Sequence, residues 1–216
     1  MWTTSPLLVV GLGNPGRQYA STRHNVGWMV LDELASAHAA ETFRKKFSGE
    51  YAEAIIEGRS AYLLRPETYM NESGRSVQPA AAFFDIEPAN IIALHDELDL
   101  PFGEVRIKVG GGHAGHNGLR SIIRHLGSPD FVRVRIGIGR PPAGFKGEVA
   151  DYVLSSFDAS ERAELPDVIA KAADAVRKIA ALGVQRAMNE VNMRPKGDKV
   201  RAPSSGPRGS GGGNGA

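Results

Sequence analysis

The chain has 216 residues, 42% of them hydrophobic, and a formal net charge of +2, which suits one sizeable core at roughly 150 residues per domain. It has no cysteine, which excludes disulfides, thiolate nucleophiles and cysteine-based zinc sites and fits a reducing compartment. Because no apolar run approaches the ~20 residues that span a bilayer and no signal-peptide pattern is present, we expect a cytoplasmic protein without membrane segments.

Hydrophobic periodicity predicts alternating strands and helices. In chain order, the sequence predicts a strand over 7–10, a helix over 25–39, a hairpin of strands over 51–57 and 60–65, a helix over 71–84, strands over 91–94 and 105–109, a helix over 119–126, a strand over 131–138 and a long helix containing 165–179. Ser21 or Thr22 is the expected cap of the first helix. The fold class is therefore α/β, a single-domain three-layer α/β/α arrangement with a mixed, mostly parallel sheet.

The composition changes near the C-terminus. Beyond Pro195 the chain is rich in Gly, Ser and Pro and has no periodicity, so it cannot bury enough surface to order itself. From Arg194 onward there are five basic residues and one acidic residue, a net charge of +4 that leaves −2 for the rest. We expect a catalytic domain over 1–194 and a disordered basic tail over 195–216.

A second concentration of positive charge lies within the expected domain. Residues 103–146 carry eight basic and two acidic side chains, a net charge of +6. A local positive field in a near-neutral protein suggests a phosphate-bearing partner on one face. A solvated basic face with no partner is equally compatible with this pattern.

Residues 11–16 match the dinucleotide-binding pattern G-x-G-x-x-G, but their context does not. Pro15 lacks an amide that would contact phosphate, and the helical pattern begins only near residue 25. Residues 110–112 are three glycines without the Gly-Lys-Ser/Thr of a Walker A loop, and no Gly-x-Ser-x-Gly elbow is present. His113 and His116 have no further ligand pair at suggestive spacing, so no metal is expected.

One histidine, one aspartate and three asparagines remain as candidates for chemistry. Asp96 follows an apolar strand and His24 stands at the start of the first long helix, so both are expected at one crevice. A carboxylate that holds Nδ1–H of an imidazole fixes its tautomer and points Nε2 at a water. Asn14, Asn71 and Asn117 offer amides for a peptide-like ligand and an oxyanion, although each alone is more typical of a turn or helix cap. The set suits hydrolysis of a carbonyl compound without a metal or a covalent nucleophile.

Five segments contain these polar residues, namely 10–16 (VGLGNPG), 22–25 (TRHN), 69–71 (YMN), 95–101 (HDELDLP) and 110–118 (GGGHAGHNG), and a sixth segment, 135–139 (RIGIG), follows them. In this order and spacing they resemble the bacterial peptidyl-tRNA hydrolase family, from about residue 7 to about residue 192. The resemblance implies hydrolysis of the ester between a peptide, or an N-blocked amino acid, and the 3′ end of tRNA. The released tRNA would then be recycled.

The resemblance also implies roles for single residues. His24 would be the general base that activates water, Asp96 would support it, and Asn14 would sit by the blocked amino group and reject free aminoacyl-tRNA. The substrate and tRNA contacts would be made by Tyr19, Tyr69, Asn71, Asn117, His116, Lys108 and Arg135. Lys108 and Arg135 match the basic pair associated with the tRNA 5′ phosphate, and such phosphate contacts position tRNA without reading its sequence. No cofactor is implied, and we expect a monomer.

Two other classes of function stay open. Some relatives of this family act as RNA-binding or splicing partners, and a wild-type protein that binds tRNA without turnover would favour that class. The fold type also recurs in hydrolases of small molecules and peptides. Binding that ignores salt and the basic pair would favour a non-RNA hydrolase, because phosphate contacts release counterions.

Overall fold

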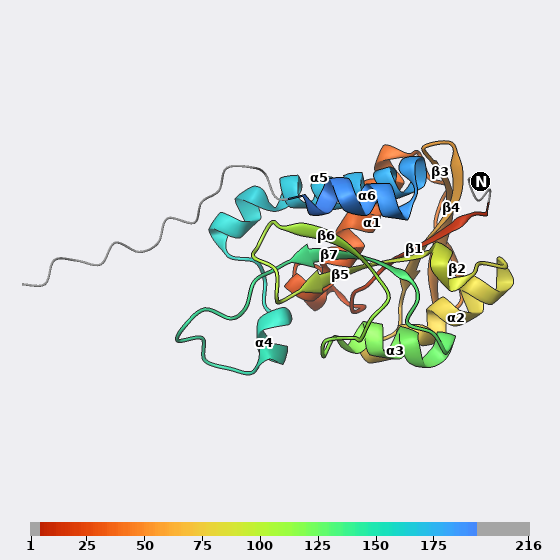
Figure 1. Ribbon diagram of the computed structural model, residues 1–216. Coiled ribbons are helices and arrows are strands. Elements are labelled where there is room, and N and C mark those ends of the chain that lie inside the picture. Colours follow the sequence, from red (N-terminus) through yellow and green to blue (C-terminus); the bar gives the residue numbers. More distant parts are fainter. Residues whose placement is uncertain (1–4, 194–216) are drawn as a thin grey trace, which may run out of the picture.

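The computed structural model describes residues 5–193, whose strands form one mixed seven-stranded sheet (Figure 1). The strands are β1 (Leu7–Gly11), β2 (Arg44–Lys46), β3 (Gly49–Ile56), β4 (Arg59–Pro66), β5 (Ile91–Glu97), β6 (Val105–Val109) and β7 (Val132–Gly137). Their order is β2-β3-β4-β1-β5-β7-β6. The three central pairings, β4–β1, β1–β5 and β5–β7, are parallel, and the outer ones are antiparallel.

Helices cover both faces of this sheet (Figure 1). They are α1 (Val26–Ala37), α2 (Gly74–Phe83), α3 (Asn117–Leu126), α4 (Val149–Val153), α5 (Ala159–Leu182) and α6 (Val184–Asn192), with 3-10 turns at Arg17–Tyr19, Arg23–Asn25, Met70–Glu72 and Pro88–Asn90. Helices α1, α5 and α6 lie on one face, and α2 and α3 lie on the other. The expected α/β class with three layers is confirmed.

Strand β1 shows why a wholly apolar run predicts a central strand. Leu7 and Val9 pack with α1 and α5 in one hydrophobic cluster, whereas Leu8 and Val10 pack with α2 and α3 in the other. All four side chains are at most 2% exposed. Because successive side chains of a strand point to opposite faces, a strand between two helical layers needs apolar residues throughout.

Two details of the predicted helices are wrong. The expected cap at Ser21 or Thr22 does not cap α1, because a 3-10 turn comes first and Thr22 Oγ1 donates to the Tyr19 carbonyl at 2.8 Å. The helix expected over 71–84 is divided into the turn at Met70–Glu72 and α2. A side chain at Gly74 would meet the Ser121 carbonyl at 2.3 Å, so glycine permits the close packing of α2 on α3.

The parallel strands place the polar loops at one edge of the sheet. Strands β1, β4 and β5 are adjacent and parallel, so the segments that follow Gly11, Pro66 and Glu97 leave from the same side. No helix within residues 5–193 is long and apolar enough to cross a membrane. The expected tail lies outside the described residues, and the division at residue 194 stays a prediction.

Candidate active site

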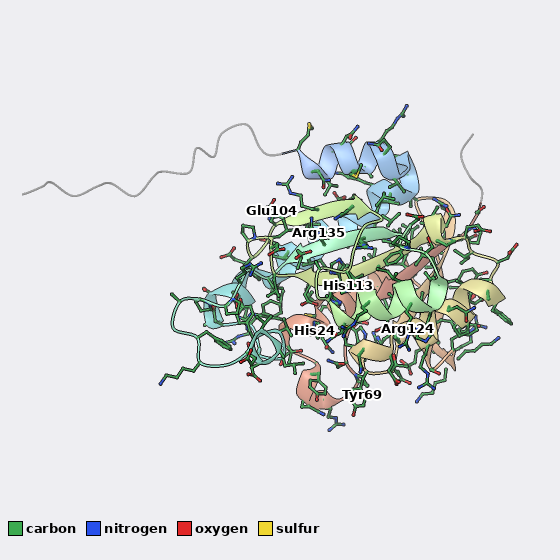
Figure 2. All side chains as sticks on the ribbon, turned by 60° about the horizontal axis from the view of Figure 1, so that its bottom comes forward. His24, Tyr69, Glu104, His113, Arg124 and Arg135 are labelled. Carbon is green, nitrogen blue, oxygen red and sulfur yellow. The ribbon has the colours of Figure 1, made fainter. Side chains whose placement is uncertain are left out.

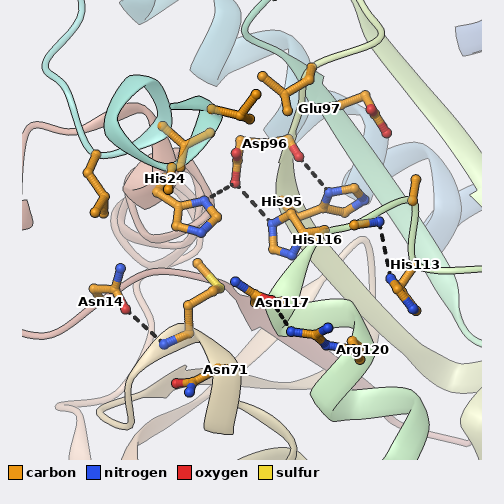
Figure 3. A pocket seen from close by; sticks show the side chains of 18 of the residues that line it. Asn14, His24, Asn71, His95, Asp96, Glu97, His113, His116, Asn117 and Arg120 are labelled. Atoms are coloured by element: carbon orange, nitrogen blue, oxygen red, sulfur yellow. Dashed lines mark hydrogen bonds and ion pairs between the residues drawn. The ribbon is translucent and has the colours of Figure 1, made fainter. Parts of the chain in front are cut away.

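A cavity of about 760 Å³ opens at the carboxyl ends of the central strands. Eight of the residues predicted for the site line it, namely Asn14, Tyr19, His24, Tyr69, Asn71, Asp96, His116 and Asn117. They come from segments far apart in the sequence, and Figure 3 shows several of them around the cavity. Such a concave site with convergent polar groups suits a ligand with hydrogen-bonding groups.

His24 and Asp96 line the cavity and contact each other (Figure 3). His24 Nδ1 is 2.8 Å from Asp96 Oδ1, and the two side chains are only 10% and 2% exposed. Because the carboxylate accepts a hydrogen bond from Nδ1–H, the lone pair of the neutral imidazole is on Nε2. The contact predicted across 72 residues of sequence is therefore present.

The environment of this pair sets its protonation. Burial lowers the pKa of His24, but the charge of Asp96 and its hydrogen bond outweigh burial and raise this pKa above its ordinary value. Burial would raise the pKa of Asp96, but His24 and His116 hold it well below its usual range. Asp96 is thus ionised at neutral pH, and His24 binds a proton more readily than a free imidazole.

The backbone that carries His24 is held from two sides. Its neighbour Arg23 is buried, pairs with Glu161 and donates from the backbone N–H to the Ser155 carbonyl at 3.1 Å. On the other side, a side chain at Gly27 would lie 2.3 Å from the Leu94 carbonyl. Glycine therefore lets the first turn of α1 approach the end of β5, which brings His24 to Asp96.

Asn14 is held in one orientation. Its Oδ1 accepts the Met70 N–H at 2.8 Å (Figure 3), and its Nδ2, which has no partner in the described part of the chain, remains for a ligand. The Asn25 side chain accepts the Asn14 N–H and donates to the Asn14 carbonyl, both at 2.9 Å. This double contact fixes the loop after β1, because it satisfies both backbone groups of Asn14.

The remaining predicted contacts come from three segments that line the cavity. Asn117 begins α3, and its Oδ1 accepts a hydrogen bond from Arg120, while its Nδ2 has no partner within residues 5–193 and can serve a ligand. Asn71 lies in the turn before α2 and is exposed to solvent, as is Tyr69, which is 62% exposed. Tyr19 is half-buried in the turn after β1. Large exposed side chains at a cavity are suited to contact with a partner.

His24, Asp96 and His116 also bring three potential ligand atoms within 4.8 Å of one another. A metal ion needs lone pairs on its ligands. Here His24 Nδ1 and His116 Nε2 both face Asp96 Oδ1 at hydrogen-bond distance, 2.8 and 3.0 Å. These contacts place N–H groups against the carboxylate, so the cluster suits proton transfer better than metal binding.

Lys108 and Arg135 lie together, outside the lining of the main cavity. They share a hollow of about 500 Å³ beside α6, at the edge of the sheet formed by β6 and β7. In Figure 2, Arg135 lies toward α6 while Tyr69 lies on the other side of His24. Arg135 Nε donates to Glu97 Oε2 at 2.9 Å, and Glu97 also lines the main cavity. This ion pair therefore connects the basic hollow with the lining of the main cavity at the end of β5.

Known proteins match this chain over most of its length. A family model described as peptidyl-tRNA hydrolase matches residues 8–200. The peptidyl-tRNA hydrolase of Sorangium cellulosum is 66% identical over 193 residues, which cover 89% of this chain and 86% of that protein. That of Mycobacterium tuberculosis H37Rv is 52% identical over 188 residues, 87% of this chain and 97% of that protein. The chain belongs to the peptidyl-tRNA hydrolase family.

A solved structure agrees with this assignment. The crystal structure of peptidyl-tRNA hydrolase from Acinetobacter baumannii has a TM-score of 0.81 and 42% identity, and the match covers 89% of this chain and 96% of that one. The family and the enzyme class expected from the sequence are confirmed. The roles of single residues in this chain stay predictions.

The sequence analysis missed several residues that support the site. Arg133 is buried and donates to the carbonyls of Gly111 and Gly112, both at 2.5 Å, so it holds the glycine loop of the family motif. Asn25 also supports the site, because its side chain fixes the backbone of Asn14. Its position in the TRHN segment, next to His24, could have indicated this role. The sequence offered no such signal for Arg133, because the alternation of apolar and basic residues on β7 predicts only that its side chain faces away from the core.

His95 is a buried histidine next to Asp96. Burial, together with the neighbouring His116, lowers the pKa of His95 to about 3. As the pH falls below 6.5, the unfolded chain binds a proton at His95 that the folded chain does not, so stability is lost over the window from 6.5 toward 3. Between pH 7 and 5 this one group should lower the free energy of unfolding by about 2 kcal/mol.

The variant His95→Asn tests this prediction, because it removes the titration and keeps a donor for the Asp96 carbonyl, which His95 Nδ1 contacts at 2.8 Å. Urea unfolding at pH 7 and pH 5 should show a smaller loss of stability in the variant. Equal losses in both proteins would mean that His95 titrates alike in the folded and unfolded chains.

Proposed function

We propose that this protein hydrolyses the ester between a peptide, or an N-blocked amino acid, and the 3′ end of tRNA. In this reaction His24, supported by Asp96, activates the water. The observation that carries the proposal is the 2.8 Å contact between His24 Nδ1 and Asp96 Oδ1 in the lining of a cavity of about 760 Å³. Family membership supports peptidyl-tRNA as the substrate, and the contact supports His24 as the base that activates water. Release of N-acetyl amino acid from N-acetyl-aminoacyl-tRNA tests both.

In the first step, His24 Nε2 takes a proton from a water whose oxygen bonds to the ester carbonyl carbon. The carbonyl oxygen then carries a negative charge, and the imidazolium is stabilised by ionised Asp96. In the second step, the bond to the ribose oxygen breaks, and His24 returns its proton to that oxygen. The products are a carboxylic acid and the free 3′ hydroxyl of tRNA, and the base form of His24 is restored.

The asparagines supply donors without adding charge. The Nδ2 groups of Asn14 and Asn117 remain for a ligand, because their Oδ1 atoms already accept hydrogen bonds from Met70 and Arg120. A donor at Asn14 suits the acyl carbonyl of a blocked amino group. A free ammonium offers no acceptor there, which accounts for rejection of unblocked aminoacyl-tRNA. Asn71 and Asn117 would hold the peptide end and the oxyanion.

Lys108 and Arg135 would bind the phosphate at the 5′ end of tRNA. The hollow that they share is beside the catalytic edge, and Lys108 is exposed. Tyr19 and Tyr69 would contact the peptide and the tRNA end nearer to His24. A protein that acts on a product of translation works in the cytoplasm, and we propose that it does so as a monomer.

Replacing Lys108 or Arg135 with alanine should weaken tRNA binding roughly tenfold, since a charge-assisted hydrogen bond contributes about 1.5–3 kcal/mol. Titrations at several salt concentrations should give a slope of log K against log salt that is shallower by about one for Lys108→Ala. Lys171→Ala, an exposed lysine on α5, is the matched control for charge. An unchanged slope in Lys108→Ala would favour a substrate without this phosphate contact.

A further inference from the structure

Two imidazoles meet the same carboxylate oxygen in the active site (Figure 3). His24 Nδ1 lies 2.8 Å and His116 Nε2 lies 3.0 Å from Asp96 Oδ1. All three side chains are at most 10% exposed. The rings of His24 and His116 lie 5.1 Å apart between centroids, so both are packed around one charge.

The position of the proton on His116 follows from its second nitrogen. His116 is the N-cap of α3, and its Nδ1 accepts hydrogen bonds from the N–H groups of Gly118 at 3.1 Å and Leu119 at 3.3 Å. Backbone N–H groups can only donate, so Nδ1 bears the lone pair and Nε2 bears the proton. The start of α3 therefore fixes a tautomer that points an N–H at Asp96.

We propose that His116 is a positioning residue, which holds a second N–H on Asp96 and thereby sets how strongly Asp96 attracts a proton to His24. The proposal rests on the proposed role of His24 as the base. It gives His116 a role other than the substrate contact implied by the resemblance. His116 acts on the reaction through Asp96 and needs no contact with the substrate.

The physical effect of a second donor has a definite direction. A hydrogen bond to the charged form of a carboxylate stabilises it and reduces its basicity. With His116 on Oδ1, Asp96 stabilises the imidazolium of His24 less than it would alone. More of His24 is then in its base form near neutral pH, while Asp96 still fixes the ring.

Asp96 is the main charged group that acts on His24, because the other acidic groups around the cavity are paired. Glu97 pairs with Arg135, and Asp99 pairs with Arg140. His95, whose ring centroid is 5.0 Å from that of His116, is neutral at ordinary pH.

Three further side chains complete these surroundings. Arg120 contacts Asn117, and His113 Nδ1 accepts the Gly115 N–H at 3.1 Å. Arg23 is balanced by Glu161, and the remaining titratable groups of the lining are the phenols of Tyr19 and Tyr69.

Two variants separate the contact with Asp96 from the cap of α3. Asparagine is a favoured N-cap but is too short to reach Asp96, so His116→Asn keeps the cap and removes the donor. Glutamine places an amide N–H near the position of Nε2, so His116→Gln keeps the donor and removes the cap. His116→Ser is a second cap-preserving variant if the asparagine variant does not fold.

Three quantities are measured for each variant. The pKa of His24 is obtained from an NMR titration of carbon-labelled histidine, the acid limb from the pH profile of kcat/KM, and the stability from the melting temperature. In His116→Asn we expect the pKa of His24 and the acid limb to rise together by about one unit, so that kcat/KM at a pH on the limb falls about tenfold while the plateau and the melting temperature are kept. In His116→Gln we expect a pKa near that of the wild type and a lower melting temperature.

An unchanged pKa of His24 in His116→Asn, or equal shifts in both variants, would overturn the proposal. The NMR titration does not depend on catalysis, so it separates this proposal from the proposed function. If the pKa of His24 shifts as expected while the acid limb of the wild type does not follow His24, the coupling stands and His24 is not the base.

Discussion

Replacing His24 with alanine is expected to lower kcat by about 10²–10⁴-fold and to leave the affinity for tRNA unchanged. The reason is that in the proposed mechanism His24 Nε2 moves the proton, whereas the proposed phosphate contacts lie at the separate hollow of Lys108 and Arg135. The measurement is kcat on N-acetyl-aminoacyl-tRNA, together with the dissociation constant for uncharged tRNA.

The control is His38→Ala, the same substitution just beyond the other end of α1 and outside the residues that line the cavity. It should turn over at close to the wild-type rate. A His24→Ala variant with near wild-type kcat would show that another group activates the water. Loss of tRNA affinity as large as the loss of kcat would instead assign His24 to binding.

Replacing Asp96 with asparagine is also expected to lower kcat by about 10²–10⁴-fold. An asparagine amide that donates to His24 Nδ1 would favour the tautomer with the proton on Nε2, which cannot act as a base. The charge of Asp96 also raises the pKa of His24, and without it burial lowers this pKa. The acid limb of the remaining activity should therefore move to lower pH.

The pH profile distinguishes this account from a loss of folding, because unfolding lowers activity without moving the limb in that direction. Asp167→Asn, an exposed carboxylate on α5, is the matched control and should keep both rate and profile. An acid limb that stays in place in Asp96→Asn would contradict the assigned effect of Asp96 on His24.

Much of the fold could be predicted because its central strands carry a strong signal. The run at Leu7–Gly11 is apolar throughout, and it lies between two helical layers. Boundaries were less predictable where a 3-10 turn comes before a helix, as at Arg23–Asn25 and Met70–Glu72. Such turns have no hydrophobic period of their own, so a helical pattern in the sequence does not separate them from the helix.

The candidate site was predictable in its parts but not in its connections. His24 and Asp96 follow from strand-end topology and the family motifs, and they are in contact. The contact of His116 with Asp96 was not predicted, because it depends on the path of the glycine loop and on the start of α3. Spacing in sequence fixes neither of these.

The most direct test of the central claim is a single-turnover assay of N-acetyl-aminoacyl-tRNA and unblocked aminoacyl-tRNA in parallel, with wild-type protein and His24→Ala. The account predicts that the wild type rapidly releases the N-acetyl amino acid, cleaves the unblocked ester far more slowly, and loses the rapid cleavage in the variant. Binding of tRNA without cleavage by the wild type would contradict it and favour a binding protein. Equal cleavage by wild type and variant would contradict the assignment of His24.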